Sequence, residues 1–167
     1  MWAYFLVERH LDRMLAIAED LGDDLVNVVP DLPGANSAYQ IVFHSCGMLE
    51  WWTREAIQGH DVGRDRDAEF TATGDLAALR RRVTEVRGNL ITDLEAIDLD
   101  GPLRGDPSAH YRETAIGRST RGVLMHVFEE LAQHHGHLEL TRDLVRAQDA
   151  AARARARSSD SRVPQSR

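Results

Sequence analysis

Residues 124–144 read "LMHVFEELAQHHGHLELTRDL", and they combine a helical apolar pattern with four of the eight histidines in the chain. In a helical projection the larger apolar side chains fall on one face, namely Leu124, Val127, Phe128, Leu131 and Leu138. A helix with one apolar face buries it against other elements. The stretch therefore predicts a helix packed in a bundle, with the histidines close to its buried side.

Three more segments have the spacing of amphipathic helices, and together with the first they define the fold class. The predicted helices span residues 2–21, 37–58, 75–97 and 119–150, and the second begins with the capping-box pair Ser37 and Gln40. The intervening connectors 59–74 and 98–118 are long for a compact domain. No segment alternates apolar and polar residues between turn signals, as a strand would. We therefore expect an all-α protein, a four-helix bundle with long connections.

Length and charge limit the possible functions. A chain of 167 residues suits one domain, so we expect the bundle to occupy residues 1–150 and an Arg/Ser-rich, flexible tail to occupy 151–167. The net charge of the chain is −7, and the tail alone contributes +4. The rest of the chain is therefore strongly acidic, and a nucleic-acid partner is not expected. The N-terminus has no signal-peptide or membrane-span pattern, so we expect a cytoplasmic protein without a membrane partner.

The single cysteine, Cys46, removes two kinds of site from consideration. One cysteine makes no internal disulfide and no thiolate-rich zinc site. It lies two residues after His44 on another helix face, and we interpret it as a packed thiol. A metal in this protein must therefore be held by histidine and carboxylate side chains.

Residues 126–137 contain a candidate metal site. Glu130 and His134 are four residues apart and share one stripe of the helix, with His126 one turn before and His137 one turn after. Two ligands at this spacing can clamp a metal from one side, and a third must come from another helix. His44 lies near apolar residues of the predicted second helix. Spacing therefore proposes His44, Glu130 and His134 as ligands.

Simpler interpretations exist for each of these features. His44 alone is typical of a buried histidine with one hydrogen-bond partner, and Glu130 with His134 also fits an ordinary helix-surface ion pair. Trp51 and Trp52 are typical of packing residues. His135, although it is next to His134, projects among the apolar residues and is a poor ligand candidate.

The connector sequence "RDRDAEF" at residues 64–70 also has two interpretations. Its alternating charges are typical of a charged connector with local salt links. Alternatively, Arg66 could reach a substrate anion. The residues alone favour the first interpretation.

Three motifs carry a resemblance to a known family. These are "PGANSAYQIVFH" at 33–44, "RDRDAEF" at 64–70 and "EELAQHHGHLELTRD" at 129–143. From residue 1 to about residue 148 the chain resembles the DinB-like, four-helix metal-binding superfamily. More narrowly, it is similar to the actinobacterial branch that contains mycothiol-dependent maleylpyruvate isomerases and mycothiol S-transferases. Many superfamily members carry H-x-x-x-H in the last helix, whereas this branch has E-x-x-x-H, which Glu130 and His134 match.

The resemblance implies a function and its cofactors. It implies a divalent metal, zinc first and nickel or iron as alternatives, bound by His44, Glu130 and His134, with mycothiol as the cosubstrate thiol. From their positions in the sequence, and not from the resemblance, we also expect His126, His137, Arg142 and Trp51 to contact the metal ligands or the substrate. We therefore expect a metal-dependent mycothiol S-transferase acting on a small electrophile, and relatives of this kind are often homodimers. All basic residues are Arg rather than Lys, which fits a GC-rich actinobacterial source.

Three alternatives remain open. The same site could hold hydroxide instead of thiolate and act as a metal-dependent hydrolase. It could also belong to a non-catalytic protein that binds metal or thiol under stress. A di-iron bundle is the weakest alternative, because His126 and Glu130 give only an H-x-x-x-E pair and the chain lacks the E-x-x-H pairs of ferritin-like sites.

Overall fold

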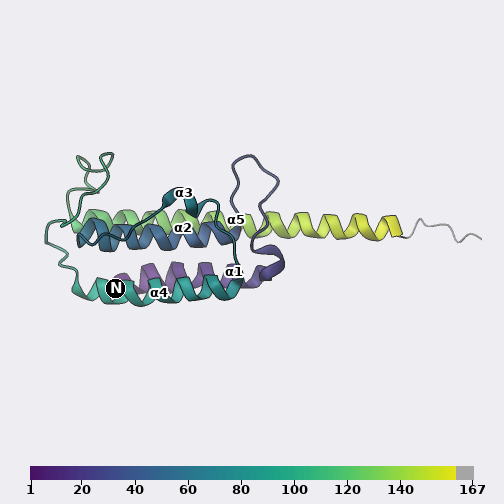
Figure 1. The fold of residues 1–167 in the computed structure, drawn as a ribbon, viewed down its shortest axis with the longest axis horizontal. Helices are drawn as coiled ribbons and strands as arrows, with labels where there is room; N and C mark the ends of the chain where they lie inside the picture. Colours follow the sequence, from purple (N-terminus) through teal and green to yellow (C-terminus); the bar gives the residue numbers. More distant parts are fainter. Residues whose placement is uncertain (161–167) are drawn as a thin grey trace, which may run out of the picture.

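The computed structural model describes the backbone of residues 1–160 and the side chains of residues 1–158. Four long helical segments lie side by side and form a bundle (Figure 1). The first combines η1 (Tyr4–Leu11) with α1 (Asp12–Leu25), and the second combines α2 (Ala38–Glu50) with η2 (Trp51–Ile57), where η marks wider π-type turns. The others are α4 (Leu76–Ala96) and α5 (Thr120–Asp160). The predicted all-α bundle with long connections is confirmed.

The arrangement of the helices brings α2 next to α5. Helix α2 contacts α4 and α5, and α1 contacts the same two helices from the other side, so the bundle closes around one apolar core. The largest fully buried side chains come from all four segments: Leu6, Leu11, Met14, Leu49, Leu79, Leu90, Leu124, Leu131 and Leu138. Burial of these side chains in a shared core is the main force that fixes the bundle.

Local hydrogen bonds set the starts of the helices. The capping box predicted for the second helix is present, because the Ser37 hydroxyl accepts from the Gln40 amide N–H at 3.2 Å and the Gln40 side chain accepts from the Ser37 amide at 2.8 Å. The Asp75 carboxylate caps α4 through the amide of Ala78. At the start of α5, the Ser119 hydroxyl accepts from the Gly122 amide at 3.1 Å. Each cap satisfies one of the N–H groups that have no hydrogen-bond partner within the first turn of the helix.

The first long connector contains structure that the sequence pattern did not predict. A short helix, α3 (Arg66–Glu69), lies against α2 and is capped by the Asp65 carboxylate, which accepts from the Ala68 amide at 3.0 Å. The connector between α4 and α5 has no helix, but it reaches back to η2, where the Arg104 amide donates to the Ile57 carbonyl at 3.0 Å. Both connectors therefore pack against the second helical segment.

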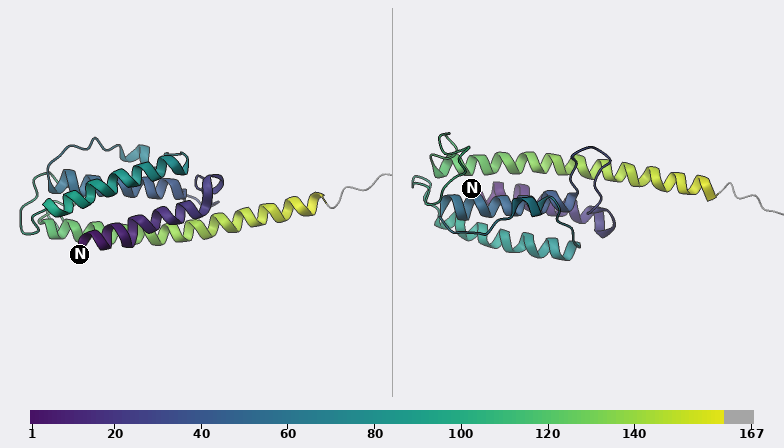
Figure 2. Two further views of the ribbon diagram at one scale, coloured as in Figure 1. Left: turned by 90° about the horizontal axis from the view of Figure 1, so that it is seen from below. Right: turned by 45° about the horizontal axis from the view of Figure 1, so that its top comes forward.

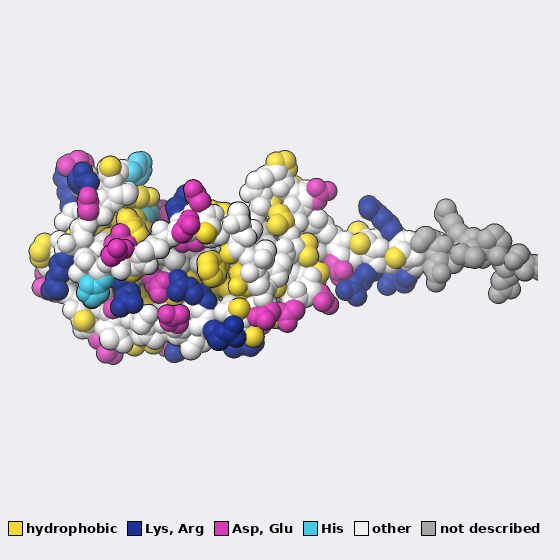
Figure 3. All heavy atoms as spheres, viewed as in Figure 1, with side chains coloured by type: hydrophobic (Ala, Val, Ile, Leu, Met, Phe, Trp, Pro, Cys, Tyr) yellow, Lys and Arg dark blue, Asp and Glu magenta, His cyan; other side chains and the backbone are white. Residues whose placement is uncertain are grey.

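Helix α5 is longer than the bundle. It continues to Asp160 instead of ending near Ala150, and its last turns project beyond the other helices (Figures 1 and 2). Residues 150–158 are exposed, and arginine side chains lie along this projection (Figure 3). The predicted flexible tail therefore begins as helix, and its remaining residues, 161–167, lie outside the described part of the chain. Within residues 1–160, no helix is both long and apolar enough to cross a bilayer.

Candidate functional site

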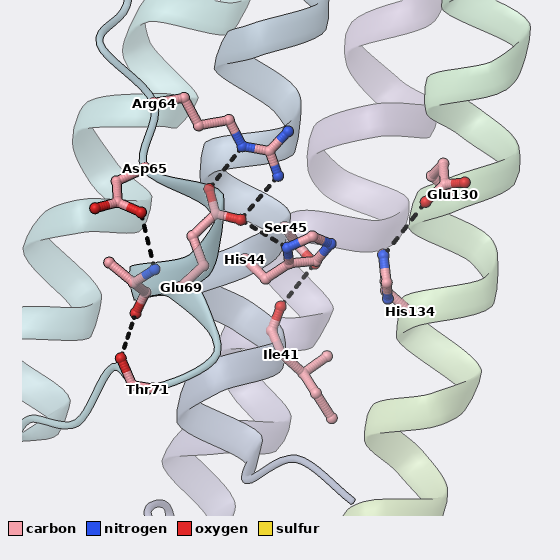
Figure 4. A network of polar contacts seen from close by, with 10 residues as sticks. Ile41, His44, Ser45, Arg64, Asp65, Glu69, Thr71, Glu130 and His134 are labelled. Atoms are coloured by element: carbon pink, nitrogen blue, oxygen red, sulfur yellow. Dashed lines mark hydrogen bonds and ion pairs between the residues drawn. The ribbon is translucent and has the colours of Figure 1, made fainter. Parts of the chain in front are cut away.

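His44 occupies the inner face of α2 and is held in one orientation. Its side chain is buried, and its Nδ1 lies 2.7 Å from Oε2 of Glu69 (Figure 4). Because a carboxylate only accepts, Nδ1 carries the proton in this contact, which leaves Nε2 for another partner. Phe70 packs on the ring with centroids 4.8 Å apart. The histidine therefore presents Nε2 as a fixed base or ligand atom.

Glu69 is itself fixed by a second charged side chain. Arg64 makes a bidentate contact with it, with Nε to Oε1 at 2.7 Å and Nη2 to Oε2 at 2.8 Å. Burial alone would raise the pKa of the Glu69 carboxyl, but the hydrogen bonds from Arg64 and His44 outweigh it and hold that pKa below its ordinary value. The carboxylate is thus ionised and ready to orient His44.

Gly47 provides the space for this arrangement. A Cβ placed on Gly47 would lie 2.0 Å from Oε1 of Glu69, far inside an ordinary contact. Gly47 is one turn after His44 on α2, so the absence of a side chain there lets the Glu69 carboxylate approach the helix. The short helix α3 and this glycine together place Glu69 beside His44.

Helix α5 contributes Glu130 and His134 from the opposite side. The rings of His44 and His134 meet edge to face, with centroids 4.8 Å apart. Nε2 of His134 is buried without a hydrogen bond and lies 3.4 Å from Oε2 of Glu130. His126 stands on the other side of Glu130, with its Nε2 3.7 Å from Oε1. The three predicted ligands therefore lie together at the α2–α5 interface (Figure 4).

The environment keeps His134 neutral. Burial first, and then the nearby His44, lowers the pKa of His134 from 6.5 to about 4, although Glu130 acts in the opposite direction. A neutral imidazole is the form that binds a metal. At neutral pH His134 consequently offers an uncharged imidazole beside the carboxylate of Glu130.

A pocket of about 370 Å³ opens beside these residues. Its walls come from α2, η2, α5 and both connectors: His44, Met48, Trp51, Trp52, Arg64, Arg66, Ser108, Tyr111, His126 and Glu130. Arg66 stands over the Phe70 ring at 5.2 Å and lines this pocket, as required if it contacts a substrate. The pocket gives a small molecule access to two of the candidate ligands, His44 and Glu130, whereas His134 is not part of its wall.

Some of the other site residues predicted from the sequence line the pocket, and others lie away from it. Trp51 and His126 line the pocket, whereas His137 is exposed and Arg142 pairs with Asp143 at 2.9 Å, and neither of these two is part of the pocket wall. His135 faces η1, where its Nδ1 lies 3.1 Å from Nδ1 of His10.

Cys46 is fully buried, and burial raises the pKa of its thiol to about 12. This agrees with a packed thiol and leaves no thiolate for chemistry at neutral pH.

The side chains of His44, Glu130 and His134 are of the types that bind a divalent metal, but in this structure they do not surround a single point. Among the described residues, no group of three or more His, Cys, Asp or Glu side chains is already placed to hold a metal ion. His44 nevertheless has a carboxylate on Nδ1, which is the usual support of a metal-binding histidine, and Nε2 of His134 is a buried nitrogen that makes no hydrogen bond. Glu130 lies between the two histidines of α5, 3.7 Å from Nε2 of His126 and 3.4 Å from Nε2 of His134.

The sequence pattern alone does not identify Glu69 and Arg64 as functional residues. The alternating charges of "RDRDAEF" favour local salt links in a charged connector. The salt link exists, between Arg64 and Glu69, yet it also delivers the carboxylate to His44. One feature of the sequence points to this contact. Phe70, which directly follows Glu69, is an apolar residue that anchors the first connector against α2.

The structure is an all-helical bundle with a pocket that is lined by histidine and carboxylate side chains from two facing helices. These features are typical of the class of helical bundles that build a metal or small-molecule site from such side chains. Comparison with family profiles specifies the relationship: the mycothiol-S-transferase profile matches residues 5–147, and the chain belongs to that family. Comparison with curated proteins and with solved structures gave no match.

Proposed function

We propose that this protein is a metal-dependent mycothiol S-transferase that acts on a small electrophile. Membership of the mycothiol-S-transferase family supports the thiol and the type of reaction. The metal and the residues that hold it are our inference. The observation that carries it is the Glu69 carboxylate on Nδ1 of His44 at 2.7 Å, together with a buried Nε2 of His134 that makes no hydrogen bond and only a 3.4 Å contact with Glu130. The proposed ligands are His44, Glu130 and His134, with zinc as the first candidate and nickel or iron as alternatives.

A bound divalent cation would supply Lewis acidity, which lowers the pKa of a coordinated thiol so that thiolate exists at neutral pH. The charge of Glu130 would offset part of the charge of a bound divalent cation and would leave the site about one unit positive, as suits an anionic sulfur. Glu69 keeps the proton on Nδ1 of His44 and so fixes which nitrogen faces the site. The transferred sulfur forms a new C–S bond while the leaving group departs with its bonding electrons, and the thiol proton passes to solvent.

The pocket gives the electrophile its place. Trp51, Trp52 and Met48 form its apolar side, next to Glu130. These side chains exclude water from the sulfur, which protects a thiolate from solvation and increases its reactivity. A homodimer stays a prediction, and it rests on the family resemblance alone.

Turnover assays with zinc-loaded protein separate this proposal from its rivals. Mycothiol and monobromobimane should give a thiol-dependent increase in bimane fluorescence, and His134→Ala should remove most of it while His60→Ala, an exposed histidine in the first connector, should not. Turnover of ester or amide substrates without thiol would favour a hydrolase. Tight mycothiol binding with no transfer to any electrophile would favour a binding protein, and either result would overturn the proposal.

A further inference from the structure

The pocket has an aromatic wall that the thiol and the metal ligands do not account for. Trp52 contacts Tyr111 edge to face at 5.2 Å and His126 at 5.0 Å, and the rings of Tyr111 and His126 are tilted against each other at 4.8 Å. The three residues come from η2, from the connector before α5 and from α5 itself. Separate elements therefore converge to build one aromatic cluster, and all three residues line the pocket.

His126 is the polar member of this wall and has no hydrogen bond to any described residue. Only 6% of its surface is exposed, and its Nδ1 is buried without a partner. The nearest carboxylate oxygens are those of Glu129, 3.8 Å from Nδ1, and Glu130, 3.7 Å from Nε2, and both distances exceed hydrogen-bond range. A buried imidazole without partners is costly unless a ligand or water completes its hydrogen bonding.

The ring of His126 cannot turn away to find another partner. Trp52 and Tyr111 pack on it from two directions, so its orientation is fixed by aromatic contacts from outside α5. Glu130, to which its Nε2 points, lines the same pocket. A group bound in the pocket beside Glu130 would therefore lie next to Nε2 of His126.

We propose that Trp52, Tyr111 and His126 form the binding wall for a flat, conjugated electrophile that carries a hydrogen-bonding carbonyl or nitro oxygen, with His126 as its polar contact. The inference rests on the proposed function and specifies the class of electrophile. Aromatic faces favour a planar, polarisable ligand over a small aliphatic one, because stacking adds to the burial of apolar area. The free imidazole then selects planar ligands with an oxygen acceptor.

Two probes test this class. Monobromobimane is flat and carries carbonyl oxygens, whereas iodoethane is small, aliphatic and without an oxygen acceptor, and both alkylate mycothiol with loss of halide as the C–S bond forms. With zinc-loaded protein, we expect His126→Phe, which keeps an aromatic ring, to raise KM for monobromobimane about tenfold with little change in kcat. KM for iodoethane should change much less. His126→Gln should restore part of the bimane affinity, and His60→Ala should behave as wild type.

A binding measurement keeps the test independent of turnover. The unreactive syn-(methyl,methyl)bimane should quench the fluorescence of the pocket tryptophans, with a Kd about tenfold weaker for His126→Phe. Equal affinity of wild type and His126→Phe for this bimane, or an equal loss of activity on both electrophiles, would overturn the assignment. Loss of zinc from folded His126→Phe would do the same, because it would make His126 part of the metal site. Binding of the bimane without any mycothiol transfer would overturn the proposed function and, with it, the view that the occupant is a substrate.

Discussion

Replacing Gly47 by alanine should damage the support of His44 in a measurable way. The new Cβ would lie 2.0 Å from Oε1 of Glu69, whereas ordinary contacts begin at 3.4 Å, so the carboxylate must retreat by more than 1 Å. A glutamate end usually swings aside at little cost, but this one is buried and holds three hydrogen bonds, one with His44 and two with Arg64. At 2.7–2.8 Å, those bonds do not survive such a displacement.

The expected change in stability follows from these contacts. Hydrogen bonds to charged groups contribute about 1.5–3 kcal/mol each, but Glu69 and Arg64 can reach water after the displacement, so a total loss of about 2–4 kcal/mol is reasonable. Alanine gains about 1 kcal/mol over glycine in a helix interior, which leaves a net destabilisation of about 1–3 kcal/mol. Zinc affinity should fall about 10- to 100-fold, as it does when the carboxylate behind a ligating histidine is lost.

The matched control is Gly88→Ala in α4, where no atom lies within 4 Å of the added Cβ. This variant should be about 0.5–1 kcal/mol more stable than wild type, because only helix propensity changes. Urea unfolding measures the stabilities, and competition with a chromophoric chelator measures the zinc affinities. If Gly47→Ala matched Gly88→Ala in both measurements, the role assigned to Glu69 and Gly47 would be refuted.

Three further predictions concern the fold and the ionisable groups. Ser37→Ala should cost about 1 kcal/mol in urea unfolding through loss of the capping box, and an unchanged midpoint would show that the box adds nothing. For the metal-free protein, the pKa of His134 in the folded state, about 4, lies below the ordinary 6.5. The contribution of neutral His134 to the free energy of unfolding is therefore complete above pH 6.5 and is lost as the pH falls toward 4. Allowing for partial exposure, the loss is about 2 kcal/mol, and His134→Gln should flatten this part of the pH profile in thermal unfolding. Cys46 should resist iodoacetamide at pH 7 until the protein is unfolded, which mass spectrometry detects, and rapid labelling of the folded protein would contradict its burial.

Much of the fold could be predicted from the sequence, because the relevant signals are local. Apolar spacing gave the helices, and Ser37 with Gln40 marked a helix start that the structure confirms through both capping hydrogen bonds. The end of α5 was predicted too early at Ala150, since the Ala/Arg-rich residues after it have high helix propensity and continue the helix to Asp160.

The site was only partly predictable, for a physical reason. Glu130 and His134 lie four residues apart on one helix, so their proximity follows from helix geometry. Glu69 is 25 residues from His44, and the contact depends on how the first connector folds back over α2. The pairing of Trp52 with Tyr111 likewise depends on a loop path that no periodicity encodes.

The central claim, a metal bound by His44, Glu130 and His134, is tested most directly by the zinc content of purified protein. Mass spectrometry of metals should find about one zinc per chain in the wild type and in His60→Ala, and far less in His44→Ala, Glu130→Ala and His134→Ala. Circular dichroism should show that each variant keeps its helices, so that metal loss is not caused by unfolding. Full zinc occupancy in the folded variants, or no metal uptake by the wild type, would contradict the account.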